Sequence, residues 1–462
     1  RQLVKIILKK IIFLLLVLFI GCENRNPNNL GKIALSYQQE SKKIIDAILS
    51  DSVGFNRVAE LCDTFGPRLS GSENLEKAIL WIMQEMKKDG IENVRAEEVM
   101  VPKWVRGEES AKMVKPWSKN LAMLGLGGSI GTKSNGITAK VIAVSNFEEL
   151  ANRSNEVKGK IVLFNVPFDT YSNTVKYRVR GAIEASKHGA VASLVRSVGT
   201  FSMNTPHTGN SSYEDGVKKI PHAAITIEDA AMIGRMLENG QDVEVNLKME
   251  AQNYPDVLSH NVVGEIIGSE FPDQVIVIGG HIDSWDVGQG AMDDAGGCVA
   301  AWNVLRILKE LNIRPKRTIR LVLWTNEENG LRGANAYRNK YLDKLKDHIL
   351  AIESDAGVFK PSGFGFTGPD ESLNILQDIG TLLKPIQSGV ITKGGGGADI
   401  GPIMAEGVPG MGLTVESKKY FWYHHTAADT WDKLNIQEFN QCVATMAVMS
   451  FVVADMDIRL PK

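Results

Sequence analysis

Five residues whose side chains bind metal ions are spread over about a third of this 462-residue chain. They are His281, Asp293, Glu328, Asp355 and His425. Imidazole nitrogen is a preferred zinc ligand, and carboxylates both offset the charge of two neighbouring ions and can bridge them. Two histidines with three acidic residues are what a pair of adjacent zinc ions requires. The pattern therefore predicts a hydrolase that uses two metal ions.

A sixth acidic residue stands beside one of these candidates. Glu327 directly precedes Glu328, and adjacent side chains project in different directions, so we do not expect both to be ligands. A carboxylate next to a metal site is well placed to act as a general base. Taken singly, each residue has a plainer explanation. A histidine after a strand often belongs to a loop, a Glu–Glu pair often faces solvent, and Asp before Gly is typical of a turn.

Three of the five candidates follow apolar runs that read as strands buried on both faces of a parallel sheet. The runs span 274–280, 318–325 and 348–354, and helix-like stretches such as 297–311 separate them. The fold predicted for this part is an open, mostly parallel α/β sheet flanked by helices. In such sheets ligands bind beyond the carboxyl ends of the strands. The strand pattern and the ligand pattern therefore agree.

The chain is too long for one ordinary core, so more than one domain is expected. Residues 129–252 have their own short strands and helices, Gly-rich turns and no cluster of metal-binding residues. We interpret this segment as an inserted β-rich α/β domain. Residues 23–128 would then form the N-terminal part of the catalytic domain, and residues 253–462 would form the rest.

Residues 1–22 have the character of a leader. A basic stretch precedes the apolar run IIFLLLVLFI, which ends in Gly21 and Cys22. This pattern is similar to a bacterial lipoprotein signal, so Cys22 is predicted to be lipidated and to anchor an exported protein to a membrane, on the periplasmic side or at the cell surface. A plain signal peptide or an uncleaved anchor helix is the alternative. The formal net charge of −2 gives no reason to expect a nucleic-acid partner.

Four stretches together resemble the co-catalytic dizinc family of aminopeptidases and carboxypeptidases: 279–297, 324–337, 353–357 and 424–432. In combination and in this order they make the plainer explanations improbable. The resemblance implies that Asp293 bridges two Zn²⁺ ions. It further implies the remaining roles: His281 and Asp355 in one site, Glu328 and His425 in the other, and Glu327 as the general base.

The resemblance also implies roles for residues around the ligands. Asp283 would accept the ring N–H of His281 and fix its tautomer. Many relatives have a tyrosine before the last histidine ligand, where this chain has His424. An imidazole N–H could stabilise an oxyanion there, as could Tyr423, or the aromatic run could simply pack. Asp399, in a Gly-rich segment, could contact a substrate terminus or lie in a surface turn.

The predicted activity is hydrolysis of dipeptides or short peptides, with the amino- or carboxy-terminal reading left open. The resemblance implies a protease-associated character for the insert and a homodimer. A non-catalytic surface protein on the same fold is one alternative, and a single-zinc cyclase is another. Retention of all five ligand residues and Glu327 argues against both. Cys298 lies in a predicted buried helix and is read as a packing residue.

Overall fold

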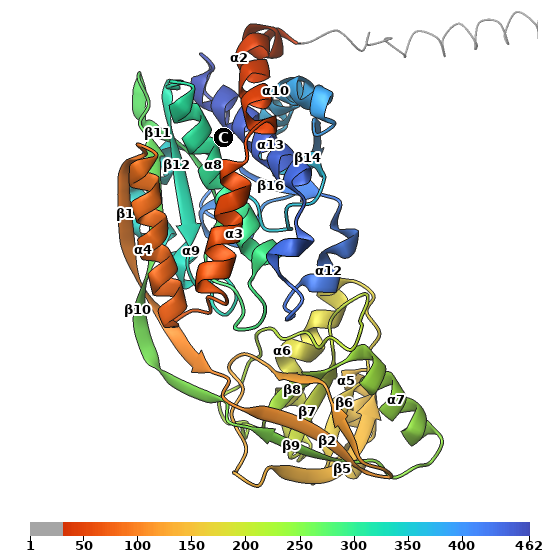
Figure 1. Ribbon diagram of the computed structural model, residues 1–462. Coiled ribbons are helices and arrows are strands. Elements are labelled where there is room, and N and C mark those ends of the chain that lie inside the picture. Colours follow the sequence, from red (N-terminus) through yellow and green to blue (C-terminus); the bar gives the residue numbers. More distant parts are fainter. Residues whose placement is uncertain (1–30) are drawn as a thin grey trace, which may run out of the picture.

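The computed structural model describes residues 31–462. The predicted leader and Cys22 lie outside the described residues. The described part folds as two units, each built on an eight-stranded sheet. The larger unit holds residues 31–105 and 252–462, and we call it the first unit. The second unit spans residues 106–251 (Figure 1).

The sheet of the first unit has the strand order β1-β10-β12-β11-β13-β16-β14-β15. Its strands are β1 (Glu92–Val105), β10 (Gln252–Ile266), β11 (Phe271–His281), β12 (Arg317–Trp324), β13 (His348–Glu353), β14 (Pro361–Thr367), β15 (Val390–Lys393) and β16 (Gly410–Val415). The neighbours β12, β11, β13 and β16 pair in parallel, whereas β10 against β12 and β14 against β16 are antiparallel. The predicted parallel sheet is therefore confirmed at its centre, and antiparallel pairs flank it.

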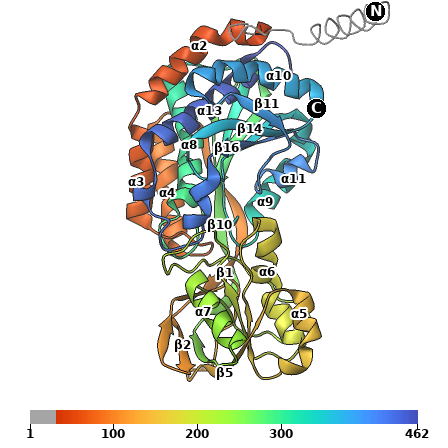
Figure 2. The ribbon, with the colours of Figure 1, turned by 90° about the vertical axis from the view of Figure 1, so that its right-hand side faces the viewer.

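Helices cover both faces of this sheet (Figure 2). The longer helices are α2 (Lys32–Leu49), α3 (Val53–Phe65), α4 (Glu73–Lys88), α8 (Gly296–Glu310), α9 (Arg332–Tyr341), α10 (Asp370–Gly380) and α13 (Ile436–Asp455). Short helical segments are α11 (Gly401–Met404), α12 (Tyr420–Tyr423), η2 (Ala291–Ala295), η3 (Leu342–Asp347), η4 (Thr381–Ile386), η5 (Ser417–Lys419) and η6 (Trp431–Lys433). None of the helices in residues 31–462 is long and apolar enough to cross a bilayer.

Alternate residues of one central strand explain the two covered faces. Ile276 and Ile278 of β11 belong to the core that includes α8 and α13, whereas Val275 and Val277 belong to a separate core with α9. Side chains alternate between the faces of a sheet, so a strand buried on both sides must be apolar at every position. This is why the run was recognisable in the sequence.

The second unit has the strand order β3-β2-β9-β5-β6-β7-β8-β4. Its strands are β2 (Glu109–Lys115), β3 (Lys119–Leu121), β4 (Met123–Gly125), β5 (Ile137–Val144), β6 (Ile161–Phe164), β7 (Ala192–Arg196), β8 (His222–Ile225) and β9 (Glu244–Met249). Its helices are α5 (Phe147–Asn152), η1 (Ser154–Glu156), α6 (Tyr171–Lys187) and α7 (Ile227–Glu238).

Residues 109–125 lie in the second sheet, although the sequence placed them in the catalytic domain. The reason is pairing across the insert, because β2 runs antiparallel to β9 and β4 runs antiparallel to β8. Short strands that complete a sheet through distant partners give no local signal of the domain to which they belong. The chain nevertheless enters and leaves the second unit at a single place. The long strands β1 and β10 pair antiparallel out to Val105 and Gln252 and carry the chain into and out of the second unit (Figure 1).

Candidate metal centre

The predicted metal-binding residues come together at the carboxyl end of the central strands. His281 is the last residue of β11, and it pairs in register with Trp324 at the end of β12. Glu327 and Glu328 follow β12, and Asp355 follows β13. Parallel strands end at a common edge, so three segments far apart in sequence deliver these side chains to one place.

Asp293 lies in the middle of the cluster. One carboxylate oxygen, Oδ1, is 3.2 Å from Nε2 of His281, and Oδ2 is 3.5 Å from Nε2 of His425. On one side, His281 Nε2 is also 3.2 Å from Oδ1 of Asp355. On the other side, His425 Nε2 is 3.0 Å from Oε2 of Glu328. The five predicted residues therefore form two groups that share Asp293.

Within residues 31–462, several of these polar atoms are buried without a hydrogen-bond partner. They include Oδ2 of Asp293 and Oε1 of Glu328. Burial raises the pKa of Glu328 well above its usual range, and the negative charge of Asp293 raises it further. Buried carboxylates that repel one another need a compensating cation. The donor set therefore fits divalent metal ions, and zinc in particular, because it combines imidazole with carboxylate.

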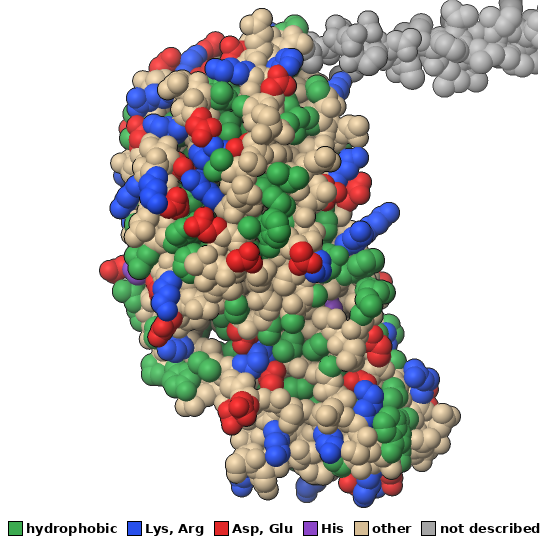
Figure 3. All heavy atoms as spheres, in the orientation of Figure 1, with side chains coloured by type: hydrophobic (Ala, Val, Ile, Leu, Met, Phe, Trp, Pro, Cys, Tyr) green, Lys and Arg blue, Asp and Glu red, His purple; other side chains and the backbone are tan. Residues whose placement is uncertain are grey.

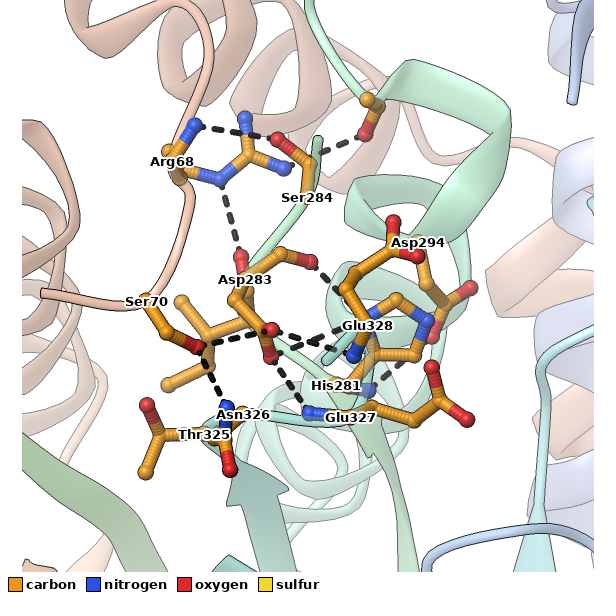
Figure 4. A network of polar contacts seen from close by, with 12 residues as sticks. Arg68, Ser70, His281, Asp283, Ser284, Asp294, Thr325, Asn326, Glu327 and Glu328 are labelled. Atoms are coloured by element: carbon orange, nitrogen blue, oxygen red, sulfur yellow. Dashed lines mark hydrogen bonds and ion pairs between the residues drawn. The ribbon is translucent and has the colours of Figure 1, made fainter. Parts of the chain in front are cut away.

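Asp283 does not make the contact that the sequence predicted. Nδ1 of His281 lies 2.8 Å from the backbone carbonyl of Asp283, whereas the Asp283 carboxylate is 3.9 Å away. That carboxylate accepts instead the backbone N–H groups of Glu327 and Glu328, at 3.1 and 3.3 Å, and the hydroxyl of Ser70, at 3.2 Å (Figure 4). Asp283 thus holds the turn that carries Glu327 and Glu328, because its side chain reaches the neighbouring strand end.

Asp429 is a positioning residue that sequence reasoning missed. Its carboxylate accepts the backbone N–H groups of Ala291, Met292 and Asp293 at 3.1, 2.7 and 3.1 Å. Burial raises its pKa to about 7, although these hydrogen bonds oppose the shift. The residue lies in the recognised motif 424–432, but only the folded chain shows that it orients the central carboxylate. Asp294 caps α8 through Gly297 and also accepts the backbone N–H of His281.

Arg68 is a second positioning residue that the sequence did not reveal, because its partners lie more than 200 residues further along the chain. It is fully buried, and its guanidinium donates to the carbonyl oxygens of Ile282, Gln289 and Gly290 at 2.9, 2.7 and 3.1 Å. Its backbone N–H donates to the hydroxyl of Ser284 at 3.0 Å (Figure 4). It therefore fixes the loop between His281 and Asp293.

The aromatic residues 420–424, directly before His425, both pack together and lie near Asp293. The ring of His424 stacks on that of His425 with centroids 3.5 Å apart, and its Nε2 lies 3.8 Å from Oδ2 of Asp293. Tyr420, a member of the aromatic run, lies near the Asp293 carboxylate. Burial and the surrounding carboxylates raise the Tyr420 pKa, which keeps its hydroxyl protonated.

The remaining candidates are settled by burial. Asp399 is 1% exposed, and neither of its carboxylate oxygens has a partner within the described residues. It therefore does not lie in a surface turn, as one reading of its Gly-rich segment suggested. Cys298 is buried in α8, as predicted, and Cys62 and Cys442 are also buried and free.

Comparison with known proteins identifies the class. Residues 261–450 match Peptidase family M28. Carboxypeptidase Q of Homo sapiens is 49% identical over 88% of this chain and 86% of its own length, and that of Bos taurus is 48% identical over 96% and 94%. The crystal structure of a Peptidase M28 precursor from Shewanella amazonensis has a TM-score of 0.89 at 32% identity, covering 92% of this chain and 98% of that one.

The chain therefore belongs to peptidase family M28. Within the family it is a carboxypeptidase Q-like, zinc-dependent metallo-exopeptidase. The family and the enzyme class predicted from the sequence are confirmed, and the non-catalytic alternative is not favoured.

Proposed function

We propose that this exopeptidase uses two Zn²⁺ ions to hydrolyse dipeptides or other short peptides. The observation that carries the proposal is the position of Asp293 between the pair His281 and Asp355 and the pair Glu328 and His425. A carboxylate with one oxygen toward each pair is suited to bridge two ions. Zinc ions bound there would supply Lewis-acid activation of water and of the substrate carbonyl.

A different set of ligands is geometrically possible for the site that contains His425, because Asp293, His424 and His425 lie close enough together to share an ion. The stacking of the two histidines favours Glu328 instead. A ring nitrogen offers its lone pair in the plane of the ring, and the planes of His424 and His425 are only 19° apart. Stacked rings therefore direct their lone pairs side by side and not toward one ion. Glu328 also contributes the negative charge that a second cation needs.

Glu327 is the proposed general base. It follows β12 beside the cluster, and its backbone N–H is held by Asp283. Burial raises its pKa to about 8; the charge of His281 opposes that shift and the charge of Asp355 adds to it. A carboxylate in this position can take a proton from the attacking water and return it to the leaving amine. His424, whose buried Nδ1 has no hydrogen-bond partner among the described residues, is the proposed oxyanion stabiliser, and the Tyr420 hydroxyl is a second proposed donor.

The second unit covers one side of the site, which favours chain ends as substrates. Tyr171 of α6 packs edge-on against the ring of His424, and the rings of Tyr171 and Phe421 stack. His207 contacts the backbone carbonyl of His424. A substrate cleaved in mid-chain would have to extend from the site in both directions, and the second unit stands in one of them. We propose, from the resemblance alone, that the second unit is a protease-associated domain.

We propose three further properties of the whole protein. The pattern of residues 1–22 supports export and a lipid on Cys22 that holds the protein at a membrane, the family resemblance supports a homodimer, and the net charge gives no reason to propose a nucleic-acid partner. Figure 3 shows basic and acidic side chains interspersed over one face of the molecule. Mass spectrometry of the mature N-terminus and sedimentation of the soluble part test the first two.

The activity is tested with one dipeptide in free, N-acetylated and C-amidated forms, using zinc-loaded mature protein. We expect cleavage of the free dipeptide, with Glu327→Ala inactive at unchanged zinc content. Loss of activity on acetylation would show that the amino terminus is read, and loss on amidation would show that the carboxylate is read. If all three forms stay intact while the zinc sites are full, the proposal is wrong.

A further inference from the structure

The second unit reaches one of the proposed metal ligands directly. The backbone N–H of Thr208 donates to the carbonyl oxygen of His425 at 2.9 Å. In return, Nδ1 of His425 lies 3.3 Å from the carbonyl oxygen of Thr208. His425 has a φ of 60°, in the left-handed region, which is uncommon for residues other than glycine although histidine, asparagine and aspartate adopt it more often than most. Such a conformation persists where surrounding contacts impose it.

The tautomer of His425 depends on this contact. Its Nε2 faces Asp293 and Glu328, and a nitrogen that binds zinc must be unprotonated. The ring proton then sits on Nδ1. The backbone carbonyl oxygen of Thr208 accepts this proton, because the other neighbouring group, the guanidinium of Arg178, can only donate.

Arg178, on α6, holds this acceptor in place. Its Nη1 is 3.4 Å from the carbonyl oxygen of Thr208 and 3.3 Å from Nδ1 of His425, and its Nη2 donates to the hydroxyl of Tyr171 at 2.8 Å. The side chain is buried, with 4% of the residue exposed. Gly209 makes the approach possible, since a Cβ at that position would lie 2.4 Å from the guanidinium.

A neighbouring contact strengthens the same connection. Nδ1 of His207 donates to the carbonyl oxygen of His424 at 2.8 Å, and the His207 backbone N–H donates to the hydroxyl of Ser197 at 2.9 Å. His424 and His425 of the first unit are therefore tied to His207 and Thr208, consecutive residues of the second unit.

We propose that the second unit is a structural part of the metal centre: Thr208, held by Arg178, positions His425, so that zinc binds tightly at the site of Glu328 and His425 only when the two units are docked. Arg178 and Thr208 are positioning residues in this account. The inference rests on the proposed two-zinc function and adds that the two sites differ in which units build them. One site is built by the first unit alone, and the other is completed by the second unit.

The test is the affinity of the full mature chain for zinc, measured by competition with a chromophoric chelator. The variant Arg178→Met removes the guanidinium and keeps the length of the side chain. We expect one of the two dissociation constants to rise about 10- to 100-fold, as for the loss of other groups that orient ligands, and the other to change less than twofold. Arg178→Lys should restore part of the loss, and Gly209→Ala should reproduce it.

Arg180→Met is the matched control, because Arg180 lies on the same helix and forms only ion pairs at the surface. Unchanged zinc constants in Arg178→Met would overturn the inference. So would an equal loss at both sites with a lower melting temperature, since that is general destabilisation. The wild-type chain and His425→Ala separate this result from the parent proposal. Two constants, one of them weakened in His425→Ala, would uphold the two-zinc site whatever Arg178 does.

Discussion

The chemistry of the site was visible in the sequence because ligand type and spacing are properties of individual residues. His281, Asp293 and Glu328 were identified from their side chains and the strands before them, and the structure places them together. The groups that orient them were not identified. Asp429 reaches the backbone of residues 291–293 across 136 positions of sequence, and no local pattern marks such a contact. Asp283 was identified, but its partner proved to be a backbone turn.

Glu327→Gln tests the base at the scale of one residue. The amide keeps the size of the side chain but cannot accept a proton, so kcat should fall about 10²- to 10⁴-fold. Zinc content and KM should stay close to the wild-type values, because Glu327 is not a proposed ligand. Steady-state kinetics with metal analysis measures all three. A kcat within threefold of wild type would exclude Glu327 as the base.

Asp429→Asn tests how Asp293 is held. One carboxylate oxygen accepts the N–H of Asp293 and the other accepts two further N–H groups, so an amide must leave at least one donor facing its own NH₂. We expect both zinc constants to weaken about tenfold, since Asp293 serves both ions. The control is Asp432→Asn, an exposed neighbour. If affinity for zinc were equal in the two variants, Asp429 would have no positioning role.

At the scale of elements, the buried strands β11, β12 and β13 were predictable because both of their faces are apolar. The order in which they pair was not, and neither were the antiparallel flanks, because pairing depends on partners distant in sequence. Residues 109–125 show the limit most clearly. Their strands are short and join a sheet whose other members come as much as 140 residues later.

His348, the first residue of β13, makes the free energy of unfolding depend on pH. Its Nε2 accepts the hydroxyl of Tyr337 at 2.9 Å, and its Nδ1 donates to Lys344 oxygen at 3.1 Å. Burial lowers its pKa to about 4, against 6.5 for a free histidine. The unfolded chain therefore takes up this proton first as pH falls, so the free energy of unfolding decreases between pH 6.5 and 4, by up to about 3 kcal/mol.

Urea unfolding of wild type and His348→Gln at pH 7 and pH 4.5 measures this effect. Glutamine cannot be protonated, so the difference in stability between the two proteins should shrink at the lower pH. A difference that stayed constant would show that His348 does not contribute to acid destabilisation.

At the scale of the whole molecule, the sequence predicted an inserted unit but not the contacts that hold the two units together. Arg106, between β1 and β2, makes such contacts. Its guanidinium pairs with both oxygens of Asp286 in the first unit at 2.8 and 2.5 Å. It also donates to Gly125 oxygen and to the Thr208 hydroxyl in the second unit. Each contact joins segments that are distant in sequence, so composition could not reveal them.

Arg106→Met should loosen this junction. It leaves Asp286 without its partner, and breaking a buried pair in this way costs about 3–5 kcal/mol, less here because Asp286 is partly exposed. We expect a lower melting temperature and faster proteolysis between the units. The double variant Arg106→Met, Asp286→Asn should recover part of the stability, since Asp286 is then no longer an unpaired charge and only Glu109, the second ion-pair partner of Arg106, lacks it. Equal stability of the single variant and the wild type would contradict this role.

The central claim is that two zinc ions flank Asp293, and anomalous diffraction at the zinc absorption edge tests it most directly. Crystals of the zinc-loaded mature protein should give two strong peaks, one beside His281 and Asp355 and one beside Glu328 and His425, with the Asp293 carboxylate between them. A single peak, or a second peak coordinated by His424 in place of Glu328, would contradict the account.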